Sequence, residues 1–158
     1  MLEKCRNAKE RWGGVSQIID QWLEQRQQVI SGFINLPDAE VGEMLNARLD
    51  EFCSNLIDYI SSGHFEVYEQ LLNEGKDFKD GSVAEAQKLL PLIQSSTDSA
   101  LDFNDVIHGF SSPTLRELRD FSTQLSCLGE KLEERFELED QLIEILHNAH
   151  KEQINATA

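Results

Sequence analysis

The sequence predicts an all-α protein, an antiparallel up-and-down helical bundle with four long helices. Apolar residues recur at helical spacing over most of the 158 residues, whereas strict alternation and runs of β-branched residues are rare. The segments between the helical stretches are short, and helices joined by short connections pack antiparallel to each other. A hydrophobic content of 40% allows one continuous core. We therefore expect a single bundle domain over residues 1–152 and a polar C-terminal tail over residues 153–158.

The first two helices are expected over residues 2–32 and 41–73, where broad apolar faces recur at helical spacing. Gly13 and Gly14 lie within the first helix and should weaken or bend it. Gly63 lies in the middle of the second helix at some cost in stability, which indicates a kink or a close approach of another helix.

The third and fourth helices have recognisable start signals. Ser82 followed by Glu85 resembles a capping box, and Pro91 should kink the helix that follows. Ser112 stands directly before a proline, a pattern typical of a helix start, and the last helix should run to about Lys151.

Composition excludes several classes of function. A formal charge of -15 and a pI near 4.5 argue against binding nucleic acid, because phosphates require a basic surface. The charge favours either a basic protein partner or simple solubility. The three cysteines are too widely spaced for a disulfide framework or a zinc site, which indicates a reducing compartment. No apolar run is long enough to span a membrane, so we expect a cytoplasmic protein.

The most informative feature is a set of polar residues within apolar helix faces. Leucines recur every seven residues from 118 to 146, but Glu139 takes one of these positions, and Arg135 interrupts the neighbouring row. Arg135 and Glu139 are four residues apart, so they can pair on one face. His64, Tyr68 and Glu69 occupy a similar stretch of the second helix and can share a sector with them. A buried charge without a partner costs several kcal/mol, so this layer either fixes the bundle register or supports a functional site.

Acidic side chains form stripes outside these faces. Such runs are usually solvated helix faces, but stripes at spacings of three and four residues also suit a basic partner helix. The stripes on the last and second helices consist of Glu133, Glu137, Asp140 and Glu144, and of Asp50, Asp58 and Glu66.

A metal site is the alternative interpretation. HFEVYE beside RFELED vaguely resembles the hemerythrin-like pattern, in which helices of a bundle supply His and Glu ligands. Arg135 occupies the place where that pattern needs a histidine, and a fixed cation repels a metal ion. His147 and His150 fit better as a solvated face that compensates the helix dipole. No nucleophile or phosphate-binding motif occurs, so we expect neither an enzyme nor a cofactor.

The chain closely resembles the Rsd/AlgQ family of bacterial anti-sigma regulators (regulator of sigma D). The resemblance rests on three blocks in order: RWGGVSQIIDQWLEQR (residues 11–26), DYISSGHFEVYEQLL (58–72) and ERFELEDQLIEILHNAH (134–150). The first block is most similar to the AlgQ side of the family. The resemblance implies a helical bundle that binds the C-terminal promoter-recognition domain of the primary sigma factor. Such binding would block the contacts of sigma with promoter DNA and core RNA polymerase.

By the resemblance, the family's recurrent positions fall on Asp58, Tyr59, Gly63, His64, Phe65, Tyr68 and Glu69 of the second helix and on Arg135, Phe136, Glu139 and Asp140 of the last. We expect Asp58, Phe65, Glu66 and Asp140 to point outward and touch sigma, and His64, Tyr68, Arg135 and Glu139 to point inward and orient them. The full set of candidate binding residues is Asp58, Tyr59, His64, Phe65, Glu66, Tyr68, Glu69, Arg135, Phe136, Glu139 and Asp140. Other cytosolic regulatory proteins are further possible partners.

Overall fold

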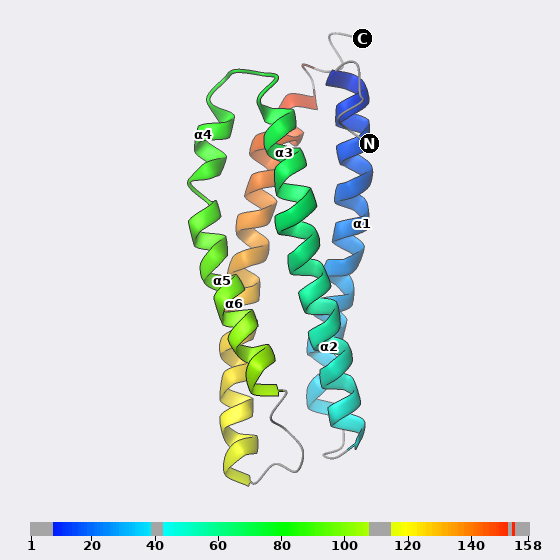
Figure 1. Cartoon of the computed structure of the whole chain (residues 1–158), viewed down its shortest axis with the longest axis vertical. Helices are drawn as coiled ribbons and strands as arrows, with labels where there is room; N and C mark the ends of the chain where they lie inside the picture. The colour runs from blue at the N-terminus through cyan, green and yellow to red at the C-terminus, as the bar shows by residue number, and fades with distance from the viewer. Residues whose placement is uncertain (1–7, 39–42, 108–114, 152, 154–158) are drawn as a thin grey trace.

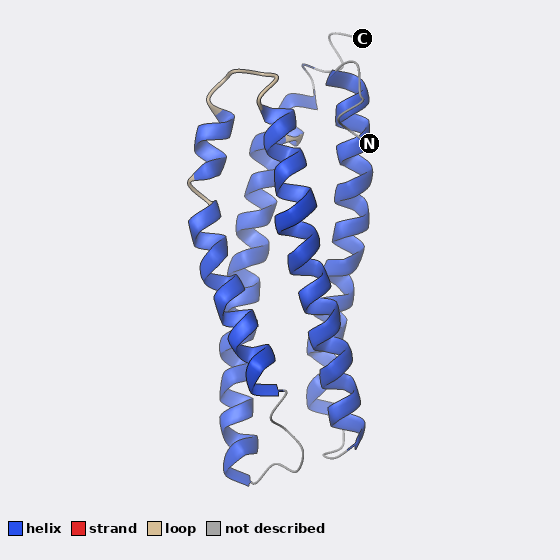
Figure 2. Cartoon of the chain, viewed as in Figure 1, coloured by secondary structure: helices blue, strands red, loops and turns tan. Residues whose placement is uncertain are grey.

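Four helical rods lie side by side, each antiparallel to the one before it (Figure 1). The computed structural model describes residues 8–38, 43–107, 115–151 and 153. Within these ranges the chain forms helices joined by turns and contains no strand (Figure 2). The predicted all-α up-and-down bundle is therefore confirmed. None of the helices in the described ranges is both long and apolar enough to cross a membrane.

The first rod is α1 (Ala8–Asn35), which ends in a short 3-10 turn, η2 (Leu36–Asp38). The helix continues without interruption through Gly13 and Gly14. A Cβ at Gly13 would meet no atom within 4 Å, so no neighbouring side chain requires a glycine there.

The second rod consists of three segments, α2 (Glu43–Ser62), the π-helix η3 (Gly63–Val67) and α3 (Tyr68–Gly75). In η3 the backbone N–H of Tyr68 donates to the carbonyl of Gly63, five residues earlier. A Cβ at Gly63 would lie 3.2 Å from both the Trp22 and Tyr68 rings. The predicted irregularity at Gly63 is therefore confirmed as a π-bulge, a feature often found at functional sites.

The third rod is divided into α4 (Ser82–Gln87) and α5 (Leu90–Ile107). Pro91 does not kink a continuous helix as expected. It lies in the first turn of α5, where its missing N–H has no intrahelical partner to lose. The expected capping box at Ser82 is also wrong, because Ser82 lies inside α4 and the Asp80 carboxylate accepts the hydrogen bond from its backbone N–H at 3.1 Å.

The fourth rod is α6 (Leu115–Leu146), followed by the 3-10 turn η4 (Asn148–His150). Several expectations lie outside the described residues: the start of the first helix, Cys5, the Ser112 start signal and residues 154–158 of the polar tail.

The core fills the space between all four rods. The rods pack in chain order, α1 on α2 and α3, α2 on α5, and α5 on α6. The backbones of α1 and α6, which close the ring, are packed less closely than these pairs. The largest apolar and aromatic side chains of the core are almost fully buried and include Trp22, Phe52, Leu56, Tyr59, Leu71, Ile93, Leu142 and Leu146.

Candidate functional site: a buried ion network and the surfaces around it

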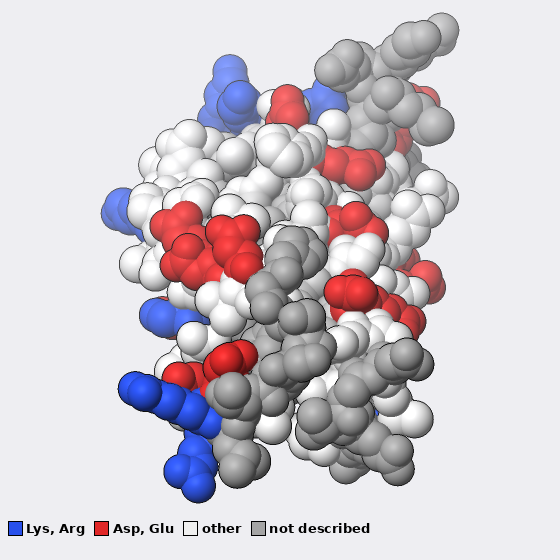
Figure 3. Space-filling model, turned by 60° about the horizontal axis from the view of Figure 1, so that its bottom comes forward, with Lys and Arg blue, Asp and Glu red and all other residues white. Residues whose placement is uncertain are grey.

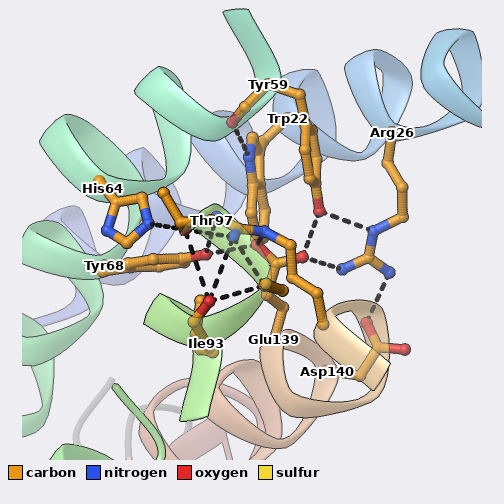
Figure 4. A network of polar contacts seen from close by, with 11 residues as sticks. Trp22, Arg26, Tyr59, His64, Tyr68, Ile93, Thr97, Glu139 and Asp140 are labelled. Atoms are coloured by element: carbon orange, nitrogen blue, oxygen red, sulfur yellow. Dashed lines mark hydrogen bonds and ion pairs between the residues drawn. The ribbon is translucent and has the colours of Figure 1, made fainter. Parts of the chain in front are cut away.

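The centre of the site is the Glu139 carboxylate, which has no solvent exposure. The Tyr59 hydroxyl donates to one of its oxygens at 2.5 Å, and the Tyr68 hydroxyl donates to the other. The Arg135 Nε lies 3.3 Å from the same oxygen as Tyr68. The predicted pair of Arg135 and Glu139 is therefore present, and both members are fully buried. Figure 4 shows the network around Glu139.

The guanidinium of Arg135 connects three rods. Its NH2 donates to the Tyr68 hydroxyl at 3.1 Å, and its NH1 donates to Ser96 Oγ at 3.0 Å and Thr97 Oγ1 at 2.7 Å on α5. A buried cation is costly unless its donors have partners, and two hydroxyls of α5 accept hydrogen bonds from its NH1. Its Nε contacts Glu139 as an ion pair but has no hydrogen-bond partner among the described residues. Sequence patterns alone did not indicate Ser96 and Thr97, since short polar residues in a helix are common.

Arg26 extends the network from α1 to the surface. Its Nε donates to the Tyr59 hydroxyl at 3.0 Å and its NH1 donates to the exposed Asp140 carboxylate at 2.7 Å. The Arg26 guanidinium also lies over the Phe136 ring, 4.9 Å from its centroid. Arg26 was not identified from the sequence. It follows Trp22 by four residues and interrupts the apolar stripe of α1, just as Arg135 interrupts that of α6.

Burial dominates the electrostatics of this network. It raises the pKa of Glu139, an effect that Arg135, the two tyrosine hydroxyls and Arg26 oppose. The pKa values of Tyr59 and Tyr68 are raised far above the usual value, first by burial and then by the Glu139 charge, so both remain neutral donors. Hydrogen bonds to charged groups are worth about 1.5–3 kcal/mol each, so the network holds its rods firmly in register.

His64 lies at the edge of the network. It is half-buried in η3, and its Nε2 lies 2.9 Å from Thr97 Oγ1. Its ring meets the Tyr68 ring edge to face at 5.0 Å between centroids. Burial, followed by the Arg135 charge, lowers the pKa of His64. His64 is therefore a packed, hydrogen-bonded residue that is neutral next to a fixed cation.

The structure separates the candidate contact residues by burial. Asp58, Phe65, Glu66, Glu69 and Asp140 are exposed, with Phe65 at 80%. The expected inward position is confirmed for the buried Tyr68, Arg135 and Glu139 and for the half-buried His64. Tyr59, which was also among the candidates, is fully buried, so neither it nor the other buried residues can touch a partner in this conformation.

The exposed candidates Glu66 and Asp140 lie in different parts of the surface. Glu66 lines a hollow between α1 and η3, together with Gln21 and Gln25 of α1. Phe136 and Asp140 line a groove between α1 and α6. The two seams lie on opposite sides of α1, so the structure presents two surfaces.

Acidic residues of both stripes are exposed, as predicted for Glu133, Glu137 and Asp140 on α6 and for Asp50 and Asp58 on α2. Figure 3 shows one face of the protein, on which acidic side chains gather in clusters and basic ones lie mostly towards the margins.

A second buried polar cluster, at the end of the bundle where α3 and α6 meet, was not predicted. His147 Nδ1 lies 2.7 Å from the Glu74 carboxylate, and His150 Nε2 lies 2.7 Å from the Asp80 carboxylate. Trp12 stacks on the first histidine at 4.6 Å between centroids. The expectation of a solvated histidine face is therefore wrong, because both histidines are buried.

The hemerythrin-like alternative is not supported. Across the described ranges of the chain, no group of three or more His, Cys, Asp or Glu side chains is placed to hold a metal ion. Arg135, which occupies the place of a ligand in that pattern, is instead the cation that pairs with Glu139.

Fold and site together define an acidic all-helical bundle with a buried network of ion pairs and hydrogen bonds at its centre. A family model described as "Regulator of RNA polymerase sigma(70) subunit, Rsd/AlgQ" matches residues 1–147. The chain belongs to the Rsd/AlgQ family of regulators of the RNA polymerase sigma(70) subunit.

Two relatives illustrate the similarity. The "Regulator of sigma D" of Salmonella paratyphi A (strain ATCC 9150 / SARB42) is 36% identical over 154 residues, which cover 94% of this chain and 93% of the relative. The protein of the same name from Salmonella newport (strain SL254) is 36% identical over 157 residues, with the same coverage. No solved structure matches the chain.

Proposed function

We propose that this protein binds the primary sigma factor through its C-terminal promoter-recognition domain and so blocks the contacts of sigma with promoter DNA and core RNA polymerase. The proposal follows from membership of a family of sigma(70) regulators. It places the protein in the cytoplasm, where RNA polymerase acts.

The observation that carries the proposal is an exposed acidic and aromatic surface on the second rod. Phe65 is a large apolar side chain that is 80% exposed, and Asp58, Glu66 and Glu69 of the same rod are exposed as well. Exposed aromatic side chains surrounded by charge are typical centres of protein interfaces. A DNA-binding domain presents a basic surface, which acidic residues complement.

The buried network fixes the orientation of the second rod, which carries this surface. Tyr59 and Tyr68 lie on the same rod as Phe65, on either side of η3, and their hydroxyls are held by Glu139. The π-bulge shifts the helical register between them by one residue, so the network determines which side chains face outward at η3. In this proposal Tyr59, Tyr68, Arg135 and Glu139 orient the contact residues without touching sigma.

The test is a binding titration with full-length primary sigma factor and with a sigma factor that lacks its C-terminal domain. We expect binding to the first and none to the second. Phe65→Ser should weaken binding roughly thirtyfold, equivalent to about 2 kcal/mol for a central interface residue. Asp58→Lys should weaken it most at low salt, because charge steering is screened as ionic strength rises.

Glu85→Lys is the matched control, since Glu85 is exposed on α4 and carries the same charge change. Equal binding to the truncated sigma factor would contradict the proposal, as would Phe65→Ser and Asp58→Lys variants that fold and bind with unchanged affinity.

A further inference from the structure

We propose that the groove between α1 and α6 is a second docking site, which takes an amphipathic helix of another protein with Lys or Arg beside its apolar face. This goes beyond the proposed sigma contact, which we assign to the second rod. The groove has a volume of about 360 Å³, within the usual range for ligand pockets.

The floor of this α1/α6 groove is apolar. Val29 and Leu132 are buried beneath it, and the half-buried rings of Phe33 and Phe136 line it. Phe33 lies so close to α6 that a Cβ at Gly129 would come within 2.7 Å of its ring. Glycine therefore allows the ring to lie against the helix backbone. A groove with this lining removes apolar side chains of a partner from water at about 25 cal/mol per Å².

The rim on the α6 side is acidic. Glu133, Glu137 and Asp140 line it at spacings of four and three residues, and all three are exposed. Among the described residues, Asp140 is paired with Arg26, whereas no ion pair or hydrogen bond is seen for Glu133 or Glu137. Like charges four residues apart on a helix cost a few tenths of a kcal/mol, a cost that a basic partner would remove.

The geometry suits a helix in particular. The rim extends over seven residues of α6, about 10 Å or two helical turns. Partner helices bind such grooves through apolar residues spaced i, i+3, i+4 and i+7 over the same length. Lysines or arginines flanking those residues would face the rim.

The charge argues against a second copy of this chain as the occupant. The formal net charge is -15, and two copies that met at this seam would bring acidic rims together. The groove also lies across α1 from the hollow that Glu66 lines, so a helix bound there leaves the second rod open.

The first test uses a fluorescent amphipathic peptide of leucine and lysine as the probe, followed by anisotropy at low and physiological salt. We expect saturable one-to-one binding. A scrambled peptide of the same composition, and a peptide with Glu in place of Lys, should bind at least tenfold more weakly. Equal binding of the scrambled peptide would overturn the proposal, because it would indicate nonspecific attraction to an acidic protein.

Variants then locate the site. Glu133→Lys combined with Glu137→Lys should weaken peptide binding at least tenfold. Asp120→Lys combined with Glu130→Lys makes the same charge change at exposed positions of the same helix outside the groove, and should have little effect. Equal losses in the two double variants would overturn the proposal.

The apolar floor and the independence of the site need their own measurements. Ile30→Asn, in the groove, should weaken peptide binding severalfold, whereas Leu92→Asn, an exposed apolar position on α5, should not. Saturating full-length sigma factor should leave the peptide bound. Displacement by sigma would assign the groove to the sigma contact, and displacement by self-association would assign it to a second copy; either result overturns the proposal.

Discussion

The bundle contains two buried polar clusters of different construction. In the central network, Arg135 and Glu139 of α6 have partners on each of the other three rods, and Arg26 extends the network to the exposed Asp140. The cluster at the end of the bundle consists of two separate pairs, Glu74 with His147 and Asp80 with His150. One carboxylate oxygen of Glu74 is buried with no hydrogen-bond partner among the described residues.

The two clusters differ in how many hydrogen bonds connect their members. The central network joins rods through shared hydrogen bonds, so the loss of one member affects several others. Each pair at the end joins one histidine to one carboxylate, so the loss of one member affects a single partner. We therefore expect the centre to set the register of the rods and the end to make a smaller, local contribution to stability.

The largest effect is expected for Arg135→Ala. The substitution leaves Glu139 buried without its main cation and should lower the free energy of unfolding by about 3 kcal/mol or more. Urea denaturation followed by circular dichroism measures it. A loss of only a few tenths of a kcal/mol, as for an exposed helix pair, would contradict the network.

Arg135→Leu with Glu139→Leu restores an apolar seam but leaves the Tyr68 hydroxyl without a partner, whereas the Tyr59 hydroxyl keeps its hydrogen bond from Arg26. Adding Tyr68→Phe should recover more stability than the double substitution alone, because an unpaired buried group costs about 1–3 kcal/mol. We expect the triple variant to be folded but weakened for sigma. A variant that binds sigma as tightly as the natural protein would mean that the network has no part in recognition.

The next effect is expected at the end of the bundle. His147→Leu removes the partner of the buried Glu74 and should cost about 2 kcal/mol, the range for a hydrogen bond to a charged group. Adding Glu74→Leu should recover part of this loss, because no buried charge then remains. Chemical denaturation of both variants beside Arg135→Ala gives the comparison, and a cost for His147→Leu above that of Arg135→Ala would reverse the proposed ranking.

A smaller effect tests how tightly the rods meet at the central network. Gly63→Ala places a methyl group 3.2 Å from Trp22 and Tyr68, and overpacking of this kind costs about 1 kcal/mol or more. Gly13→Ala is the control, because its added Cβ meets nothing and should stabilise the helix by up to about 1 kcal/mol. Melting temperatures should therefore move in opposite directions, and a shift of the same sign for both would refute the close approach.

The smallest effect concerns pH. The pKa of His64 is lowered by burial and by Arg135, so the unfolded chain binds this proton more readily than the folded one. Stability should therefore fall as pH drops below the ordinary histidine value of 6.5, and His64→Gln should flatten this part of the profile.

The end of the bundle should respond in a different pH range. Hydrogen bonds from Ser82 and the neighbouring His150 lower the pKa of Asp80, so its contribution is present above the ordinary value of 3.8 and is lost in stronger acid. Denaturation curves between pH 3 and 7.5 for the natural protein, His64→Gln and Asp80→Asn separate the two ranges. An unchanged slope between pH 5 and 7 in His64→Gln would contradict the assignment.

The two clusters also differ in how far the sequence predicted them. Arg135 and Glu139 were found because each replaces an apolar residue in a regular seven-residue pattern, and only a buried partner makes that substitution tolerable. The same reasoning applied to α1 would have found Arg26. His147 and His150 gave no such signal, since histidines near a helix end are usually solvated, and their carboxylate partners lie about 70 residues earlier in the chain.

The sequence by itself determined the class of fold, the four rods, the inward position of the Arg135 and Glu139 pair and the family, because helical periodicity and motif order are local properties of the chain. Only the tertiary structure decided which side chains meet. It united Arg26 with Asp140, placed Glu66 and Asp140 in separate seams on either side of α1, and buried the terminal histidines. These outcomes depend on how the rods are rotated and spaced against each other, and that arrangement results from packing between segments far apart in the chain.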